Sequence, residues 1–180
     1  MRKLWKLSVA MSRVSSSNHH KMASVLHFSV FLFLVCALGI GANVNGKASS
    51  SCPSGWTRQG SRCFTFHRGS MDWATAELTC VRKGGNLASI HNQREQNFIT
   101  QLIRKLSGEN TKTWIGGYDA VKEGLWLWSD GSTFNYKGWK KGQPDKHVPP
   151  EHCAETNFKG AFWNNASCKV KRSFLCVKNL

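Results

Sequence analysis

The sequence lacks the local signatures by which common hydrolases are recognised. It contains neither a G-x-S-x-G nor an H-E-x-x-H pattern, which place a nucleophilic serine on a sharp turn or two histidines on a zinc ion. The histidines beyond residue 60 are scattered along the chain, at His67, His91, His147 and His152. We therefore expect the protein not to be an enzyme.

Acidic residues are also scarce. The 180 residues include 10 Asp and Glu against 25 Lys and Arg, which gives a formal net charge of +15. Such an excess favours anionic partners, such as sulfated or phosphorylated glycans and bacterial surfaces. A solvated basic face that only keeps the protein soluble is an equally good interpretation.

No apolar run is long enough to span a bilayer. The longest, residues 28–42, is shorter than the roughly 20 residues that a spanning helix needs. It follows Lys21 and ends in small residues, as a secretory signal peptide does, with a signal anchor as the alternative. We interpret residues 22–42 as the signal peptide, 1–21 as an upstream extension and 43–51 as a polar lead. We expect a secreted, extracellular protein, kept apart from nucleic acid and without a membrane span.

Cleavage of this peptide removes Cys36 and leaves six cysteines. An even number in a secreted chain predicts three disulfides, although six cysteines allow 15 pairings. Zinc is the competing interpretation, but the closely spaced CxxC pair that is typical of zinc sites is missing. The six are Cys52, Cys63, Cys80, Cys153, Cys168 and Cys176.

Two helices are predicted in the first half of the domain. Ser70 is expected to cap a helix over residues 71–83, which a glycine pair ends. A second helix is expected after Asn92, because Glu95 follows at the capping-box spacing, and it should end at Gly108. The apolar residues expected on their buried sides are Trp73, Ala76, Leu78 and Val81, then Phe98, Leu102, Ile103 and Leu106.

Short apolar and aromatic segments predict strands around and beyond these helices. They cover residues 61–67, 113–117, 125–128, 161–163 and 173–178. Between them, residues 129–151 form a long stretch rich in Gly, Lys and Pro. Loops of this length in a compact domain are usually functional or disordered, and the flanking cysteines and tryptophans favour function. Most tryptophans should be core residues, and Trp139, inside the loop, is the candidate for a ligand contact.

The loop carries a group of oxygen-bearing side chains. Gln143 and Asp145 flank Pro144, and Glu151 follows. Amide and carboxylate oxygens are ligands that calcium prefers. A proline between two ligands can aim both side chains to one side, particularly with a cis peptide bond. The alternative is a proline-stiffened surface loop with chance polar residues.

Ten landmarks follow one another in a recognisable order: CPSGW, CFTF, WATAELTC, GGNLASI, WIGG, WLWSDG, QPD, EHCAE, FWNNASC and FLCVK. Together they resemble the C-type lectin-like domain family over residues 52–178, in particular the galactose-type lectins of fish mucus and venom. The resemblance implies an α+β fold with two helices, small antiparallel sheets and a long irregular sugar-binding loop. It also implies the disulfides Cys52–Cys63, Cys80–Cys176 and Cys153–Cys168.

The same resemblance assigns roles to residues of the loop and of the WNN segment. The order amide–Pro–carboxylate at residues 143–145 resembles galactose-type sites. In such sites the amide and the carboxylate bind two neighbouring sugar hydroxyls and also one calcium ion. The implied sugar-binding residues are Gln143, Asp145, Glu151, Asn164 and, as a stacking ring, His147. The implied calcium ligands are Gln143, Asp145, Glu151, Asn164 and Asn165.

Three departures from the family pattern weaken the calcium site. Asn165 stands where the family has Asp, so the shell loses one negative charge and calcium should bind weakly. Asn165 also opens an N-A-S glycosylation sequon, and a glycan there would block ligation. His147 offers less apolar area for stacking than Trp does.

A second family calcium site should be absent. Asp119 and Glu123 match two of its ligands, but Lys146 and His152 stand where carboxylates are expected. We expect no metal there, and Lys146 to pair with one of the two carboxylates.

The sequence thus predicts a secreted galactose-type lectin with a weak dependence on calcium. It would bind galactose- or lactose-containing glycans and recognise or agglutinate cell surfaces in defence, venom or mucus, for which a homo-oligomer would supply several sites. The rival hypothesis is a lectin-fold protein that binds a protein, ice or an anionic surface through its basic face. The residues of that face are Lys137, Lys140, Lys141, Lys146, Lys159, Lys169, Lys171 and Arg172.

Overall fold

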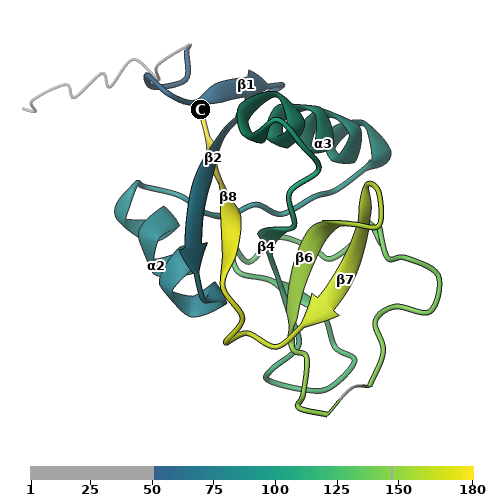
Figure 1. Ribbon diagram of the computed structural model, residues 1–180. Coiled ribbons are helices and arrows are strands. Elements are labelled where there is room, and N and C mark those ends of the chain that lie inside the picture. Colours follow the sequence, from purple (N-terminus) through teal and green to yellow (C-terminus); the bar gives the residue numbers. More distant parts are fainter. Residues whose placement is uncertain (1–50, 147) are drawn as a thin grey trace, which may run out of the picture. The chain divides into compact units, whose positions relative to one another are not determined.

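A computed structural model describes residues 51–146 and 148–180 of the chain. It shows one mixed sheet with two helices beside it (Figure 1). The strand order is β1-β2-β8-β4-β6-β7, with β3 paired to β8 and β5 to β4. Among the described strands the β4–β8 pair is parallel, where the resemblance implies antiparallel pairing throughout. The elements are β1 (Thr57–Gln59), β2 (Arg62–Met71), α2 (Trp73–Arg82), β3 (Asn86–Leu87), α3 (Gln93–Ser107), β4 (Thr113–Tyr118), β5 (Leu127–Trp128), β6 (Cys153–Phe158), β7 (Phe162–Ala166) and β8 (Arg172–Asn179).

Helix α2 begins two residues later than the sequence predicts. Met71 is held in strand β2 by pairing with Arg172 of β8, so the chain is still extended at Ser70. Asp72 is the N-cap, and its side chain accepts a hydrogen bond from the backbone N–H of Thr75 at 2.9 Å. The prediction that Ser70 caps this helix is therefore wrong, because tertiary strand pairing overrides the local signal.

The buried side of α2 also differs from the expected one. Ala76 and Cys80 are fully buried, whereas Leu78 and Val81 are 47% and 48% exposed. Cys80 is bonded to Cys176 in β8, so this cysteine fixes which side of the helix faces the sheet.

Helix α3 follows its predicted caps. The side chain of Asn92 accepts from the backbone N–H of Glu95 at 2.9 Å. Gly108 ends the helix in the left-handed conformation, with φ of 86°, a conformation that glycine adopts without steric cost. The helix buries Ile99, Leu102 and Ile103, whereas Leu106, which was expected on the buried side, is 49% exposed.

Strand β6 was not predicted, because its sequence CAETNF is largely polar. In the structure Glu155 is fully buried between Asn164 and Arg172, whose side chains donate hydrogen bonds to its carboxylate at 3.1 and 2.6 Å. Buried polar groups are tolerated when such partners satisfy them. A buried and satisfied carboxylate of this kind has no local sequence signal.

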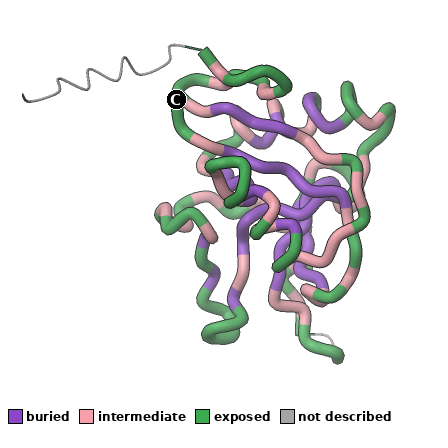
Figure 2. Tube along the Cα trace, turned by 90° about the vertical axis from the view of Figure 1, so that its left-hand side faces the viewer, coloured by how far each residue is buried: buried purple, intermediate pink, exposed green. Residues whose placement is uncertain are grey.

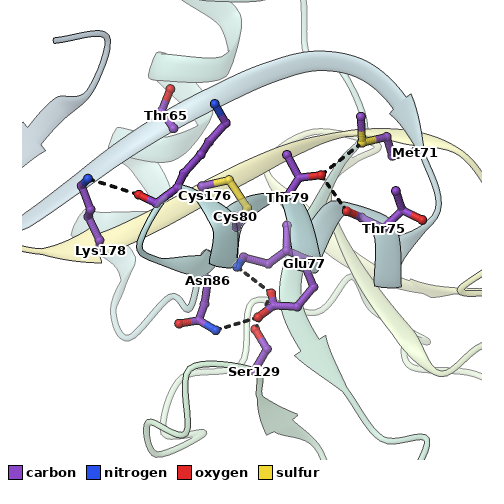
Figure 3. Close-up of a disulfide and its surroundings, with 12 residues drawn as sticks. Thr65, Met71, Thr75, Glu77, Thr79, Cys80, Asn86, Ser129, Cys176 and Lys178 are labelled. Atoms are coloured by element: carbon purple, nitrogen blue, oxygen red, sulfur yellow. Dashed lines mark hydrogen bonds between the residues drawn. A yellow bond between two sulfur atoms is a disulfide. The ribbon is translucent and has the colours of Figure 1, made fainter. Parts of the chain in front are cut away.

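Three disulfides join the pairs that the resemblance implies: Cys52–Cys63, Cys80–Cys176 and Cys153–Cys168. Figure 3 shows Cys80–Cys176 between α2 and β8. Below this bridge, the carboxylate of Glu77 accepts hydrogen bonds from the Asn86 side chain at 2.6 Å and the Ser129 hydroxyl at 3.0 Å (Figure 3). Helix α2 is thus fastened covalently to one part of the sheet and by hydrogen bonds to another.

The core lies along the central strands, which are the buried part of the trace in Figure 2. Trp114, Trp128 and Trp163 are at most 2% exposed, which confirms the prediction that most tryptophans are core residues. The loop that leads into β6 and the C-terminus lie at opposite ends of the domain (Figure 1).

Candidate functional site

The polar loop of residues 140–153 leads into β6 and is anchored to β7 near both of its ends. At its start, the backbone N–H of Lys140 donates to the carbonyl oxygen of Trp163 at 2.9 Å. At its end, Cys153 is bonded to Cys168, just beyond β7. The polar side chains between these points are therefore carried by a segment with fixed ends.

Gln143 and Asp145 lie side by side, both half-buried. The amide Nε2 of Gln143 donates to Oδ2 of Asp145 at 2.8 Å, and the backbone N–H of Asp145 donates back to Oε1 of Gln143 at 3.2 Å. The peptide bond between Gln143 and Pro144 is cis. An amide, which can donate and accept, thus stands next to a carboxylate, which only accepts.

Asn165 of β7 holds this pair in place. Its amide Nδ2 donates to the backbone carbonyls of Asp145, at 2.7 Å, and of Glu151, at 3.1 Å. Its Oδ1 accepts from the backbone N–H of Asp145 at 3.0 Å. Asn165 is 2% exposed. One buried side chain thus connects both halves of the loop to the sheet.

The structure therefore brings together four of the residues that the sequence singles out: Gln143, Asp145, Glu151 and Asn165. Asn164 contacts a different group, since its amide donates to the carboxylate of Glu155 and to its neighbour's carbonyl. His147 lies outside the described residues.

The calcium shell that the resemblance implies lacks one ligand in this arrangement, because Asn165 is occupied by the loop. The side-chain oxygen of Asn165 already accepts a hydrogen bond from Asp145, and both of its amide hydrogens are donated to the loop. Asn164 donates its amide nitrogen to Glu155, which leaves its side-chain oxygen as a potential ligand. The implied shell thus keeps oxygens of Gln143, Asp145, Glu151 and Asn164 and loses that of Asn165, so calcium should bind weakly.

Asn165 is also the glycosylation candidate. It is 2% exposed, and both of its amide hydrogens are donated to the loop. Glycosylation of this sequon stays a prediction.

Asp119 and Glu123 contact the imidazole of His152 and not Lys146, the partner that the sequence suggests. Nδ1 of His152 lies 2.9 Å from Oδ1 of Asp119 and 3.6 Å from Oε2 of Glu123. Within the described residues Lys146 makes no ion pair with either carboxylate, so the expected pairing of Lys146 is wrong. Asp119, Glu123 and His152 are the one group of three potential metal-ligating side chains in the described part of the chain.

Trp139 was the candidate for an aromatic ligand contact. Its ring packs against those of Trp126 and Trp163, with centroids 4.5 and 5.5 Å away, so it belongs in part to the core. It also lines a cavity of about 380 Å³ beside Pro144, together with Phe134. No local sequence pattern predicts this cavity, because its walls come from separate segments.

Three residues of the basic face make local contacts. Lys140 lies over the ring of Phe162 at 4.6 Å, and Lys159 over that of Phe158 at 5.3 Å. The charge of Arg172 is compensated, because its Nε donates to the buried Glu155 at 2.6 Å.

Comparison with known proteins decides the family. The model of the lectin C-type domain matches residues 69–178. The chain belongs to the C-type lectin domain family. It is 84% identical to the galactose-specific lectin nattectin of Thalassophryne nattereri over 159 residues. This aligned stretch covers 88% of this chain and 100% of nattectin. The C-type lectin domain family is not a family of enzymes.

Solved structures show the same fold in proteins with different roles. The C-type lectin CEL-I from Cucumaria echinata has a TM-score of 0.68 and 28% identity, over 71% of this chain and 96% of CEL-I. The type II antifreeze protein of herring has a TM-score of 0.66 and 34% identity, over 72% and 99%. Because one fold serves both, the function of this chain must be argued from its site. In residues 51–146 and 148–180, no helix has the length and apolarity that crossing a membrane requires.

Proposed function

We propose that this protein is a secreted lectin that binds galactose through Gln143 and Asp145, with a weak dependence on calcium. The observation that carries the proposal is the contact between the amide of Gln143 and the carboxylate of Asp145 at 2.8 Å. Two neighbouring sugar hydroxyls can replace this contact. One would bond to the amide of Gln143, which donates and accepts, and the other to the carboxylate of Asp145, which only accepts. The 84% identity to a lectin described as galactose-specific supports the choice of sugar.

The role of Asn165 supports the weak dependence on calcium. A loop that is already ordered loses less conformational entropy when ligand binds. Asn165 orders the loop with hydrogen bonds to Asp145 and Glu151. An ion is therefore not needed to bring Gln143 and Asp145 together.

The test is isothermal titration calorimetry with methyl galactoside and methyl mannoside, each in calcium and in EDTA. The wild type should bind the galactoside more tightly than the mannoside in both buffers. Asp145→Ala should weaken galactoside binding at least about tenfold, which corresponds to about 1.4 kcal/mol. Glu109→Ala, which removes an exposed carboxylate after α3, is the matched control and should bind like the wild type. Tighter binding of the mannoside, or an unchanged Asp145→Ala variant, would refute the proposal.

Agglutination of cells requires more than one site per particle. We therefore propose a homo-oligomer, which light scattering coupled to size-exclusion chromatography would detect. Lactose should inhibit agglutination of red cells. Loss of binding in modest salt, without any effect of lactose, would instead assign the activity to the basic face and its anionic partners.

A further inference from the structure

Three side chains from two segments, the turn after β4 and the end of the polar loop, lie close together. Asp119 follows β4, Glu123 lies in the next turn, and His152 precedes β6. The potential ligand atoms of these three residues all lie within 4.8 Å of one another. Glu123 and His152 line a hollow of about 290 Å³ that also includes Asp145.

The most buried of the three is held in a fixed orientation. The side chain of Asp119 is 3% exposed, and its Oδ2 accepts from the backbone N–H of Gly124 at 2.8 Å. The backbone N–H of Asp119 donates to the carbonyl of His152 at 3.1 Å, so the two ligand-bearing segments are also joined through their backbones. Hydrogen bonds of this kind orient the ligands in metal sites.

The two distances from His152 are close to those in a site for a small tetrahedral ion, and the Asp119–Glu123 pair lies within 4.8 Å. With ligand distances of about 2.0–2.1 Å, two ligands of a tetrahedral zinc ion lie about 3.3 Å apart. Nδ1 of His152 is 2.9 Å from the Asp119 oxygen and 3.6 Å from the Glu123 oxygen, one value on each side of that figure. Glu123 is 56% exposed, so its side chain can adjust.

The chemistry of the group selects against calcium. Calcium is bound by oxygen ligands, whereas an imidazole nitrogen suits zinc and related ions. Lys146 lines the same hollow, but it is exposed, and a long side chain can keep its ammonium group in water.

We infer that Asp119, Glu123 and His152 form a binding site for Zn²⁺, at a place where the sequence alone predicts no metal. The fourth position opens into the hollow beside Asp145 and is filled by water. The bound ion joins the turn at residues 119–123 to His152, the neighbour of Glu151, and thereby stiffens the end of the polar loop. This site does not depend on the identity of the sugar.

The experiment is titration of the full chain, with its disulfides intact, by ZnCl₂ in the calorimeter. Binding should persist in 5 mM calcium, on the order of a hundredfold excess over zinc, because the site selects nitrogen ligation. His152→Gln and Glu123→Gln should each weaken it at least tenfold, while His91→Gln, a histidine outside the group, should not. Replacing zinc by Co²⁺ should give the intense visible absorption of a tetrahedral site, which His152→Gln should abolish.

Circular dichroism checks that each variant is folded. Because Glu123 is exposed, Glu123→Gln provides a second test if His152→Gln is unstable. Zinc binding of unchanged affinity in both variants places the ion elsewhere, for example at His19 and His20, and overturns the inference. Displacement of zinc by calcium at similar concentrations, or the absence of zinc binding in the wild type, overturns it as well.

Discussion

Replacing Asn165 by Asp tests how the polar loop is held in place. The amide of Asn165 donates two hydrogen bonds, to the carbonyls of Asp145 and Glu151, and a carboxylate can donate neither. Each lost hydrogen bond costs about 1 kcal/mol, and leaving buried carbonyls beside a buried carboxylate adds about 1 kcal/mol or more. We expect Asn165→Asp to lower the free energy of unfolding by about 3 kcal/mol in EDTA, a decrease in Tm on the order of 10 °C.

Calcium should reverse part of this loss. The variant carries a third carboxylate beside Asp145 and Glu151, and a larger ligand charge strengthens calcium binding. Urea unfolding followed by tryptophan fluorescence, in EDTA and in 10 mM calcium, measures both effects. We expect calcium to stabilise Asn165→Asp more than it stabilises the wild type.

Asn110→Asp is the matched control. Asn110 is exposed in the turn after α3, so the same chemical change there should alter stability by less than about 0.5 kcal/mol. If Asn165→Asp in EDTA is as stable as Asn110→Asp, the hydrogen bonds of Asn165 do not hold the loop, and the argument for weak calcium dependence fails with them.

Three further predictions concern the scaffold. Burial, and then the charge of Lys83, lower the pKa of His67, so the unfolded chain takes up a proton before the folded one does. The free energy of unfolding should therefore fall as the pH drops below about 6.5, and His67→Gln should remove that slope in denaturation curves measured between pH 7.5 and 5. Asp72→Ala should cost about 1 kcal/mol in urea unfolding because α2 loses its cap, and no change would show that the cap is dispensable. Replacing both Cys80 and Cys176 by Ser should cost about 4–5 kcal/mol, because the bridge closes a loop with a sequence separation of 96 residues; a loss below about 2 kcal/mol would contradict this estimate.

The elements that could be predicted from the sequence are those determined by neighbouring residues. Asn92 and Gly108 mark the ends of α3 correctly, because capping involves residues within one turn of the helix. Ser70 does not cap α2, because the pairing of Met71 with Arg172, about a hundred positions away, keeps that segment extended. Strand β6 was missed because the partners that satisfy the buried Glu155 come from β7 and β8.

The same division applies to the candidate site. Gln143 and Asp145 are two residues apart, and their pairing follows from local sequence. The sequence marks Asn165 as a weak calcium ligand and a glycosylation candidate but not as the residue that holds the loop, because its hydrogen bonds to the loop depend on the three-dimensional fold. His152 was expected only to disrupt a calcium site, since its position between Asp119 and Glu123 depends on the folding of two distant segments.

The C-terminus and the polar loop lie at opposite ends of the domain (Figure 1). The last residues continue from β8, which Cys176 bonds to α2, so a short C-terminal extension leaves the chain at the end away from Gln143 and Asp145. A biotin or fusion partner attached after Leu180 will therefore present the loop outward on a sensor chip or a bead. Copies displayed in this way can engage a glycan-coated surface together, and their combined avidity makes a weak monosaccharide site measurable.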